Sequence, residues 1–585
     1  MDRLLRGRMT RRGFIGSSAA ALAGLAAYGC APGADTTPRT ESAPAPTSGD
    51  RSALATVEMA AFGAPFTMTN AGAIGGDVGG DLQAICHSAL CIVDHDANPI
   101  PMLAERLPSV DDGTWVVNAD GTMRMTWHLR RNVKWHDGHP FTSKDVRFSW
   151  EFNNDPALPI GRTTLTSNVT AMDTPDDYIV VMHWRNTNNF AHIATRSDLH
   201  LHPEHIVRPL WEAGDVDHML AQPFFQQGFV GLGPYRIERW ESDGTIVFKR
   251  FEDFFLGPPR IGTIVHHSVS SALNVLTLLL AGSIHRTSRN GLGFEEGIIA
   301  KEQWEARGDG TVYFMPVGFR RLLLPQDANP LFRDARLRRA LLMAVDREEL
   351  VSSLYSGQAK VAHIALAPNE PGFAAAEAAS TKHPFDPRGA LALLEQSGWR
   401  RGTDGVLANA DGERLEIPFR VPVGDAEQVR MQGAVAGFWS DIGVRVRVDN
   451  ATDAQLRDRQ ERETFPGVSA TDSGPTIASL SRRWHTRQIP NQQNRYTGDN
   501  VAHWSHPEVD RILGEIDNTF RAQEMERHLV EFSRIFADEL PVVPLYYTPE
   551  VTAAHKYLKG ARPRPAGSGQ NTWNWSAYTW EWTGP

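Results

Sequence analysis

The stretch GTMRMTWHLRRNVKWHDGHPFTSKDVRFSWEF, residues 121–152, decides how the rest of the chain is interpreted. Its first part alternates apolar and polar side chains, and this period of two predicts a strand with one buried face. The apolar positions are Met123, Met125, Trp127 and Leu129. Gly138 suits a tight turn that requires positive φ. Thr142, followed three residues later by Asp145, predicts the start of a helix.

The composition is that of a soluble globular protein with several cores. At 585 residues, two or three domains are expected. The net charge is −10; residues 1–30 contribute +4, so the remainder carries −14. This acidic balance, without a basic stripe interleaved with aromatic residues, argues against nucleic-acid binding. After the N-terminus, no run reaches the roughly 18 apolar residues that span a bilayer.

The N-terminal residues predict export. Five arginines precede an uncharged stretch at 14–28, as in a signal peptide. Residues 10–15, TRRGFI, resemble the twin-arginine consensus, which implies export of a folded protein. Cys30 resembles the lipidated cysteine of a bacterial lipoprotein; a plain signal cleavage with an incidental cysteine is the alternative. Residues 31–52, rich in Pro, Ser, Thr and Ala, predict a disordered linker.

Two further cysteines, Cys86 and Cys91, have a spacing that suits neither a zinc ribbon nor a redox pair. We expect two small buried residues, and a local disulfide is the alternative.

The segment 127–146 is similar to the hallmark of the solute-binding proteins of peptide- and nickel-type ABC transporters, family 5. In that family the run is structural and does not mark a ligand site. Further similar segments are PMLAE at 101–105, HLHPEH at 200–205, GLGPYRI at 231–237, the predicted helix pair at 334–357, the predicted helix between Asp386 and Gly398, and PVVPLYY at 541–547.

The resemblance implies an α/β, periplasmic-binding-protein-like fold with two lobes joined by a hinge, plus an extra domain (cluster C type). The implied divisions are a signal peptide at 1–30, a linker at 31–52, lobe I at 53–82, 195–285 and 541–585, the extra domain at 83–194, and lobe II at 286–540.

The implied function is that of an extracytoplasmic lipoprotein of an ABC importer, which binds a peptide or peptide-like solute and delivers it to a membrane permease. It would act as a monomer, without a cofactor and without cleaving its ligand. The ATPase would be a separate chain, because no P-loop is present, and the commonest hydrolase and metalloprotease motifs are absent too. Receptors for a metal, a metal chelate or a glycoside remain alternatives, as does a secreted hydrolase.

The resemblance points to residues 467–496 for ligand binding. In peptide-binding relatives an aspartate followed by tyrosine holds the α-ammonium of the peptide, and Asp472 aligns with it. Ser473 replaces the tyrosine, however, and the usual nearby tryptophan is absent. The role of Asp472 is therefore a hypothesis beside an ordinary Asx-turn. A basic and aromatic cluster that follows could bind carboxylate or phosphate groups and rings. Its candidate ligand-binding residues are Arg482, Arg483, Trp484, Arg495 and Tyr496.

Histidines provide the competing hypothesis. His200, His202 and His205 lie close together with Glu204, and three converging imidazoles could bind Zn²⁺ or Ni²⁺. We assign no metal site, because Pro203 changes the chain direction before His205.

Overall fold

The computed structural model describes residues 55–62, 68, 77–95, 98–158, 160, 163–289, 291–423, 425–452, 455–456, 458–563 and 573–584. The predicted signal peptide with Cys30, and the predicted linker, lie outside these residues and stay predictions. Within the ranges described, no helix combines the length and apolar character that crossing a membrane requires.

The segment 121–152 folds as predicted. Strand β5 (Met123–His128) buries every second side chain, and Gly138 has a φ of 93°. Helix α3 (Ser143–Asn153) starts after Thr142, whose backbone N–H donates to Asp145 Oδ2 at 2.8 Å. This bond satisfies one of the groups that a helix start leaves without an intrahelical partner.

A four-stranded antiparallel sheet, in the order β4-β5-β7-β6, surrounds this segment. Its other strands are β4 (Trp115–Val117), β6 (Val169–Asp176) and β7 (Ile179–Trp184). The inner face packs into a core with Trp127, Trp135 and Phe141, all fully buried.

The large sheet has the order β17-β16-β18-β12-β19-β11-β1-β10-β9-β8, with β13 paired to β19. Its strands are β1 (Thr56–Phe62), β8 (Tyr235–Trp240), β9 (Ile246–Arg250), β10 (Thr263–Val269), β11 (Arg286–Thr287), β12 (Gly310–Leu323), β13 (Lys360–Val361), β16 (Glu416–Pro422), β17 (Arg445–Ala451), β18 (Val468–Thr471) and β19 (Val542–His555). Two-stranded pairs are β2 (Cys91–Val93) with β3 (Pro99–Pro101), β14 (Arg400–Arg401) with β15 (Leu407–Ala408), and β20 (Leu558–Lys559) with β21 (Glu581–Trp582).

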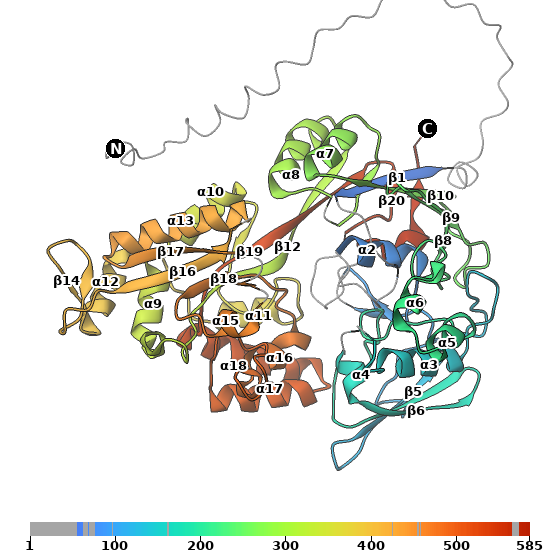
Figure 1. The fold of residues 1–585 in the computed structure, drawn as a ribbon, viewed down its shortest axis with the longest axis horizontal. Coiled ribbons are helices and arrows are strands. Elements are labelled where there is room, and N and C mark those ends of the chain that lie inside the picture. Colours follow the sequence, from blue (N-terminus) through green and yellow to red (C-terminus); the bar gives the residue numbers. More distant parts are fainter. Residues whose placement is uncertain are drawn as a thin grey trace, which may run out of the picture. The chain divides into compact units, whose positions relative to one another are not determined.

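The two longest strands, β12 and β19, run antiparallel along their whole lengths (Figure 1). On one side of this pair the sheet continues through β18 and β16, and on the other through β11 and β1. The pair is therefore the part of the sheet that both lobes share. Its register shifts between Pro316 and Gly318 and again between Arg320 and Arg321, which are β-bulges.

Helices cover the sheets. They are α2 (Asp77–Cys86), α4 (Thr164–Asn168), α5 (Glu204–Glu212), α6 (Val216–Leu220), α7 (Ala272–Leu280), α8 (Phe294–Ala300), α9 (Ala335–Met343), α10 (Arg347–Tyr355), α11 (Phe373–Ala379), α12 (Pro387–Gln396), α13 (Ala426–Asp441), α15 (Arg459–Glu463), α16 (Leu480–Trp484), α17 (Pro507–Asn518) and α18 (Ala522–Glu539).

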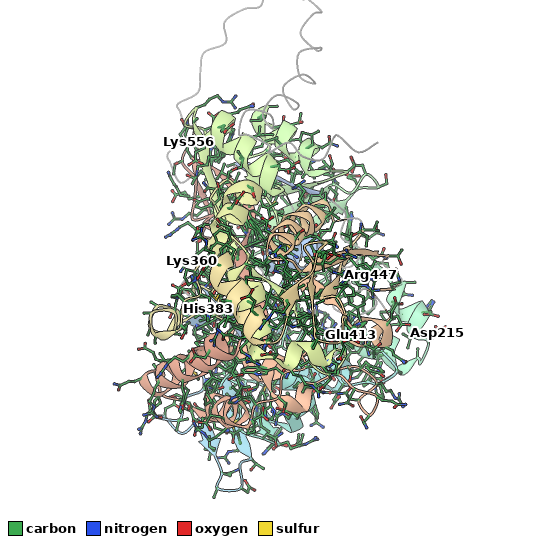
Figure 2. All side chains as sticks on the ribbon, turned by 90° about the vertical axis from the view of Figure 1, so that its left-hand side faces the viewer. Asp215, Lys360, His383, Glu413, Arg447 and Lys556 are labelled. Atoms are coloured by element: carbon green, nitrogen blue, oxygen red, sulfur yellow. The ribbon has the colours of Figure 1, made fainter. Side chains whose placement is uncertain are left out.

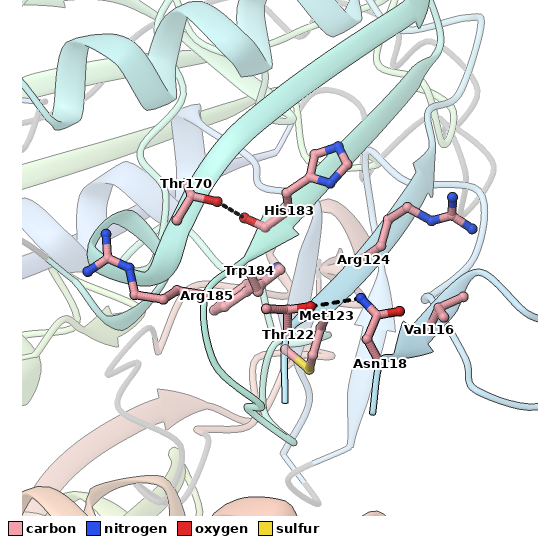
Figure 3. A pocket seen from close by; sticks show the side chains of 9 residues that line it. All are labelled: Val116, Asn118, Thr122, Met123, Arg124, Thr170, His183, Trp184 and Arg185. Atoms are coloured by element: carbon pink, nitrogen blue, oxygen red, sulfur yellow. Dashed lines mark hydrogen bonds between the residues drawn. The ribbon is translucent and has the colours of Figure 1, made fainter. Parts of the chain in front are cut away.

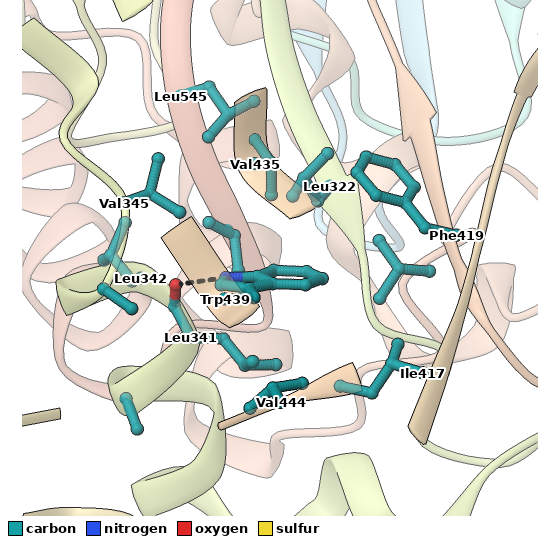
Figure 4. Close-up of a cluster of buried hydrophobic side chains, with 14 of the residues drawn as sticks. Leu322, Leu341, Leu342, Val345, Ile417, Phe419, Val435, Trp439, Val444 and Leu545 are labelled. Atoms are coloured by element: carbon teal, nitrogen blue, oxygen red, sulfur yellow. Dashed lines mark hydrogen bonds between the residues drawn. The ribbon is translucent and has the colours of Figure 1, made fainter. Parts of the chain in front are cut away.

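One core lies between β12, β16 and β19 and the helices α9, α10 and α13 (Figure 4). Trp439 is fully buried at its centre, and its indole N–H donates to the carbonyl of Leu341 at 2.9 Å. The bond lets a large aromatic group be buried without an unsatisfied donor. Charged residues such as Asp215, Glu413 and Arg447 are exposed (Figure 2).

Helix α2 ends at Cys86, and the following residues lead into β2. Strand β19 covers most of the family-like segment 541–547 and continues to His555, because β12 provides a partner along its whole length. Arg338, in α9, is 3% exposed and donates to the carbonyls of Phe332 and Leu540, among others.

Cys86 and Cys91 are both buried and unpaired, as expected. Burial raises the pKa of the Cys86 thiol to about 12, and it also raises that of Cys91. Low exposure and little thiolate make both thiols poor nucleophiles.

A buried ionic centre ties residues 573–580 to α2 and β11. The carboxylate of Asp81, fully buried, accepts backbone N–H groups of Arg289 at 3.0 Å, Trp573 at 2.8 Å and Asn574 at 3.2 Å. Burial raises the pKa of Asp81, although these bonds and nearby Arg286 favour its charged form. Arg286 is itself fully buried and donates to the carbonyls of Ala561 at 2.6 Å and Trp573 at 2.7 Å.

Asp81→Ala should destabilise the protein by about 3–5 kcal/mol, because it leaves Arg286 buried with fewer compensating groups. Urea unfolding measures the loss. The control is Asp253→Ala, which removes an exposed ion pair with Lys134 (2.9 Å) and should leave the midpoint nearly unchanged. Equal midpoints for both variants would show that Asp81 does not hold the segment.

Candidate functional site

Asp472 follows β18 directly, beside the bulged part of the β12–β19 pair. Its Oδ2 atom accepts a hydrogen bond from Thr548 Oγ1 at 2.7 Å and lies 3.4 Å from Arg320 Nη2. The side chain is 29% exposed. Gly318 is necessary here, because a Cβ atom at that position would collide with both Asp472 and Thr548. The carboxylate is therefore held by residues of both long strands.

Arg320, on β12, is buried beside this carboxylate. Its Nη2 atom also donates to Glu427 Oε2 at 2.9 Å, and Glu427 accepts the hydroxyl of Tyr546 at 2.7 Å. Burial alone would lower the pKa of Arg320, but Asp472 and Glu427 more than offset this and raise it. Its Nε and Nη1 atoms are buried and have no hydrogen-bond acceptor among the described residues.

Arg321 is 3% exposed and is bound by neutral groups. Its Nη1 atom donates to Ser473 Oγ at 2.6 Å and to the carbonyl of Phe319 at 3.1 Å. The guanidinium lies 5.3 Å from the ring centre of Phe319 and 5.8 Å from that of Trp484. Burial, and then the charge of Arg483, lower the pKa of Arg321 to about 9. Its Nε atom finds no acceptor in the part of the chain that the structure describes.

Arg483, in α16, adds a third guanidinium. Its Nε atom is buried, again with no acceptor from the described ranges. Burial, followed by the charge of Arg482, lowers its pKa. We call Arg320, Arg321 and Arg483 the arginine cluster.

Arg320 and Arg321 lie on either side of the second register shift of the strand pair. Arg320 is opposite Tyr546 and Arg321 is opposite Pro544, so one residue of β19 is skipped. Successive side chains of a strand point to opposite faces. Arg320 therefore faces Glu427 and Arg321 faces Trp484, while Asp472 lies near the point where the faces meet.

A pocket of about 190 Å³ lies where residues from 164–198 meet two segments farther along the chain, 370–371 and 476–478. The contact near it is specific: the side-chain amide of Asn189 donates to the carbonyls of Ile516 at 2.6 Å and Thr519 at 2.8 Å, at the end of α17. The pocket's second wall and Asp472 come from one continuous segment, 472–478.

A larger hollow, about 610 Å³, lies on the four-stranded sheet (Figure 3). Its polar side chains are largely exposed, and several already have partners. Asn118 donates to Thr122 at 2.8 Å, Thr170 donates to the carbonyl of His183 at 3.2 Å, and the His183 ring pairs with Asp173 at 2.8 Å. Trp184, which also lines the hollow, has a buried indole N–H without a partner among the described residues, but this is a single neutral donor. We therefore favour the arginine cluster, with its several charged donors, as the functional site.

The sequence model of one family, "Bacterial extracellular solute-binding proteins, family 5 Middle", matches residues 98–487. The chain belongs to this family. Its function is therefore to bind a solute outside the cytoplasm.

Known relatives agree with this assignment. The chain is 21% identical to the oligopeptide-binding protein AppA of Bacillus subtilis (strain 168), over 85% of this chain and 87% of AppA. It resembles the oligopeptide-binding protein from Thermus thermophilus complexed with a pentapeptide (TM-score 0.70, 22% identity, 90% of this chain, 96% of that one). It also resembles NikZ from Campylobacter jejuni in complex with Ni(L-His) (TM-score 0.68, 20% identity, covering 90% of this chain and 99% of that one). The α/β fold with two lobes is thereby shown.

In this family-5 protein the residues proposed from the sequence are distributed unevenly. Asp472 and Arg483 lie in or beside the arginine cluster. Arg482 is exposed and forms an ion pair with Asp499 at 2.7 Å. Trp484 is 3% exposed and packs on Phe536, although its ring also faces Arg321. Arg495 and Tyr496 lie in a turn with positive φ, 53° and 56°.

Sequence reasoning missed Arg320 and Arg321. The available signal was two adjacent arginines in an otherwise apolar strand, GFRRLLL at 318–324. Charged residues are almost never fully buried without a reason.

The three histidines considered as metal ligands do not converge as a set, because the rings of His200 and His202 lie 4.9 Å apart but His205 is elsewhere. His200 and His202 are buried in an apolar core, and burial strongly lowers the pKa of both. His205 instead lies 2.6 Å from Asp137 and stacks on His139. Asp137, His139 and His205 are all exposed and close enough to one another to share a metal ion. They are far along the chain from the arginine cluster.

Gly318→Ala should displace Asp472 and Thr548, with a cost of about 1–3 kcal/mol for the forced shift. Thermal or urea unfolding measures it. Gly433→Ala is the matched control, because its new Cβ meets no atom within 4 Å and alanine favours helix α13. We expect the control to be neutral or stabilising; destabilisation of both variants alike would contradict the proposed packing.

Proposed function

We propose that this chain is the receptor of an ABC importer, and that it captures a peptide or peptide-like solute between its two lobes at the arginine cluster and Asp472. It releases the solute unchanged to a membrane permease served by separate ATPase subunits. The observation that carries the proposal is two buried, incompletely bonded arginines, Arg320 and Arg321, on the strand pair that both lobes share.

The mechanism follows from where these groups lie. A solute that contacts residues of both lobes binds the closed form better than the open form and so favours closure. Converting a mostly open population into a mostly closed one takes about 5.5 kcal/mol of differential affinity. Charge-assisted hydrogen bonds in a dehydrated site are among the strongest available for this purpose.

Further parts of the proposal rest on the sequence. We propose lobe I at 53–82, 195–285 and 541–585, the extra domain at 83–194 and lobe II at 286–540. We also propose attachment to the outer face of the membrane through Cys30, action as a monomer, and the absence of bond cleavage. Arg482, Trp484, Arg495 and Tyr496 remain proposed ligand contacts beside Asp472 and Arg483.

The test is a binding screen of the purified protein against peptides of two to five residues, glycosides, free Ni²⁺ and nickel–histidine. We expect one peptide-like class to raise the melting temperature with saturation; a ligand at 100 times its dissociation constant adds about 2.7 kcal/mol. Mass spectrometry should recover that ligand intact after prolonged incubation.

Other outcomes separate the alternatives. Stabilisation by glycosides alone, or by nickel alone, would contradict the peptide-like assignment while leaving the receptor function. Progressive cleavage of the ligand would instead indicate a secreted hydrolase and would overturn the receptor function itself.

A further inference from the structure

The charges around the arginine cluster do not balance. Arg320 has two carboxylates near it, at 2.9 Å and 3.4 Å. Arg321 is bound only by a hydroxyl and a carbonyl. Among the described residues, neither Arg321 nor Arg483 has a carboxylate within ion-pair distance. The three guanidinium groups share the charges of Asp472 and Glu427, and Asp499, whose charge also reaches Arg483, is paired with Arg482.

The same groups lack hydrogen-bond acceptors. Four buried guanidinium nitrogens of the cluster have no hydrogen-bond acceptor among the described residues: Arg320 Nε, Arg320 Nη1, Arg321 Nε and Arg483 Nε. Arg320 and Arg321 are 6% and 3% exposed. A buried donor without an acceptor costs about 1–3 kcal/mol, and more when it is charged. Buried guanidinium groups in this state favour an additional acceptor that carries negative charge.

Asp472 is poorly placed to bind an ammonium group. Its Oδ2 atom already accepts from Thr548 and lies beside Arg320, and its Oδ1 atom faces Gly318. An ammonium group at this carboxylate would approach Arg320 and come under the field of Arg321. Like charges in a partly buried site repel one another with little screening.

We infer that the site binds the oxyanion group of an acidic solute, a carboxylate or a phosphate, through Arg321 and Arg483, and that Asp472 orients Arg320 rather than binding an ammonium group. The inference rests on the proposed function and narrows its ligand class. Planar guanidinium groups match the geometry of carboxylate and phosphate oxygens, often with two parallel bonds. The depressed pKa values of Arg321 and Arg483 agree with sites that gain from a nearby negative charge.

Small probes test this without knowledge of the natural ligand. Inorganic phosphate and succinate are titrated into the full chain at constant ionic strength, and the melting temperature of the protein is recorded. Succinamide, the uncharged analogue of succinate, is the control. We expect saturable stabilisation by at least one anion and none by succinamide. Absence of saturable stabilisation by either anion, or equal stabilisation by succinamide, would overturn the inference.

Variants assign the binding to these residues. Arg321→Gln and Arg483→Gln should each weaken the anion by at least about tenfold. Arg147→Gln is the control, since Arg147 lies on α3, is exposed and pairs with Glu151 at 3.0 Å, and it should bind like the parent protein. If Arg321→Gln does not fold, Arg483→Gln alone provides the test, because Arg483 lies at a half-buried position in a helix. Unchanged affinity in the cluster variant that folds would contradict the proposal.

Asp472→Asn tests whether anion binding by Arg321 and Arg483 requires this carboxylate. If Asp472 only orients Arg320, the variant should bind phosphate or succinate as well as or better than the parent protein, because one competing carboxylate is gone. Loss of anion binding would refute the assigned role.

The solute screen distinguishes this inference from the proposed function. A neutral or purely cationic solute as the best ligand would refute the oxyanion assignment and leave the receptor function intact. Cleavage of the ligand would refute the receptor function, while the anion titration would still report on the arginine cluster.

Discussion

The structure depends on the pairing of β12 with β19. These two strands are hydrogen-bonded from Gly310 to Leu323 and from Val542 to His555, and the sheets of both lobes extend from them. A regular ladder of this length would be stiff, but two bulges interrupt it near Pro316 and Arg320. Bulges bend a strand and redirect its side chains. Arg320 and Arg321 lie at the second of these irregularities, and both are near Asp472.

The arginine cluster illustrates a conflict between stability and function. Replacing a buried ionic group by apolar residues is often neutral or stabilising, so stability alone does not explain charges such as those of Arg320 and Arg321. Real proteins depart from full polar satisfaction chiefly at functional sites. Two other buried arginines, Arg286 and Arg338, donate to several carbonyls each. Arg420 also has a buried Nη1 atom without a hydrogen-bond partner, but it pairs with Asp449 at 3.0 Å, whereas Arg321 and Arg483 pair with no carboxylate of the described residues.

Local rules predicted much of the fold. The alternation around Trp127, the positive φ of Gly138 and the Thr142–Asp145 cap each depend on a few neighbouring residues, and all were confirmed. The end of β19 depends on a partner more than 200 residues away, so its full length could not be predicted.

The site was harder to predict than the fold. Arg320 is far from Glu427 and Asp472 in the sequence, and it meets them only after the sheet has formed. No local window of residues contains all three. Family resemblance located Asp472, but it could not reveal which cations surround it.

The buried centre at Asp81 has a consequence for biosynthesis. Its hydrogen bonds to Trp573 and Asn574 join residues 492 and 493 positions apart. At roughly 5–20 residues per second, the ribosome makes that distant segment tens of seconds after α2. The lobe that contains β1 cannot close its core during this interval. The core residues of the nascent chain therefore stay partly exposed until translation has passed residue 574. Chaperones have this defined period in which to act.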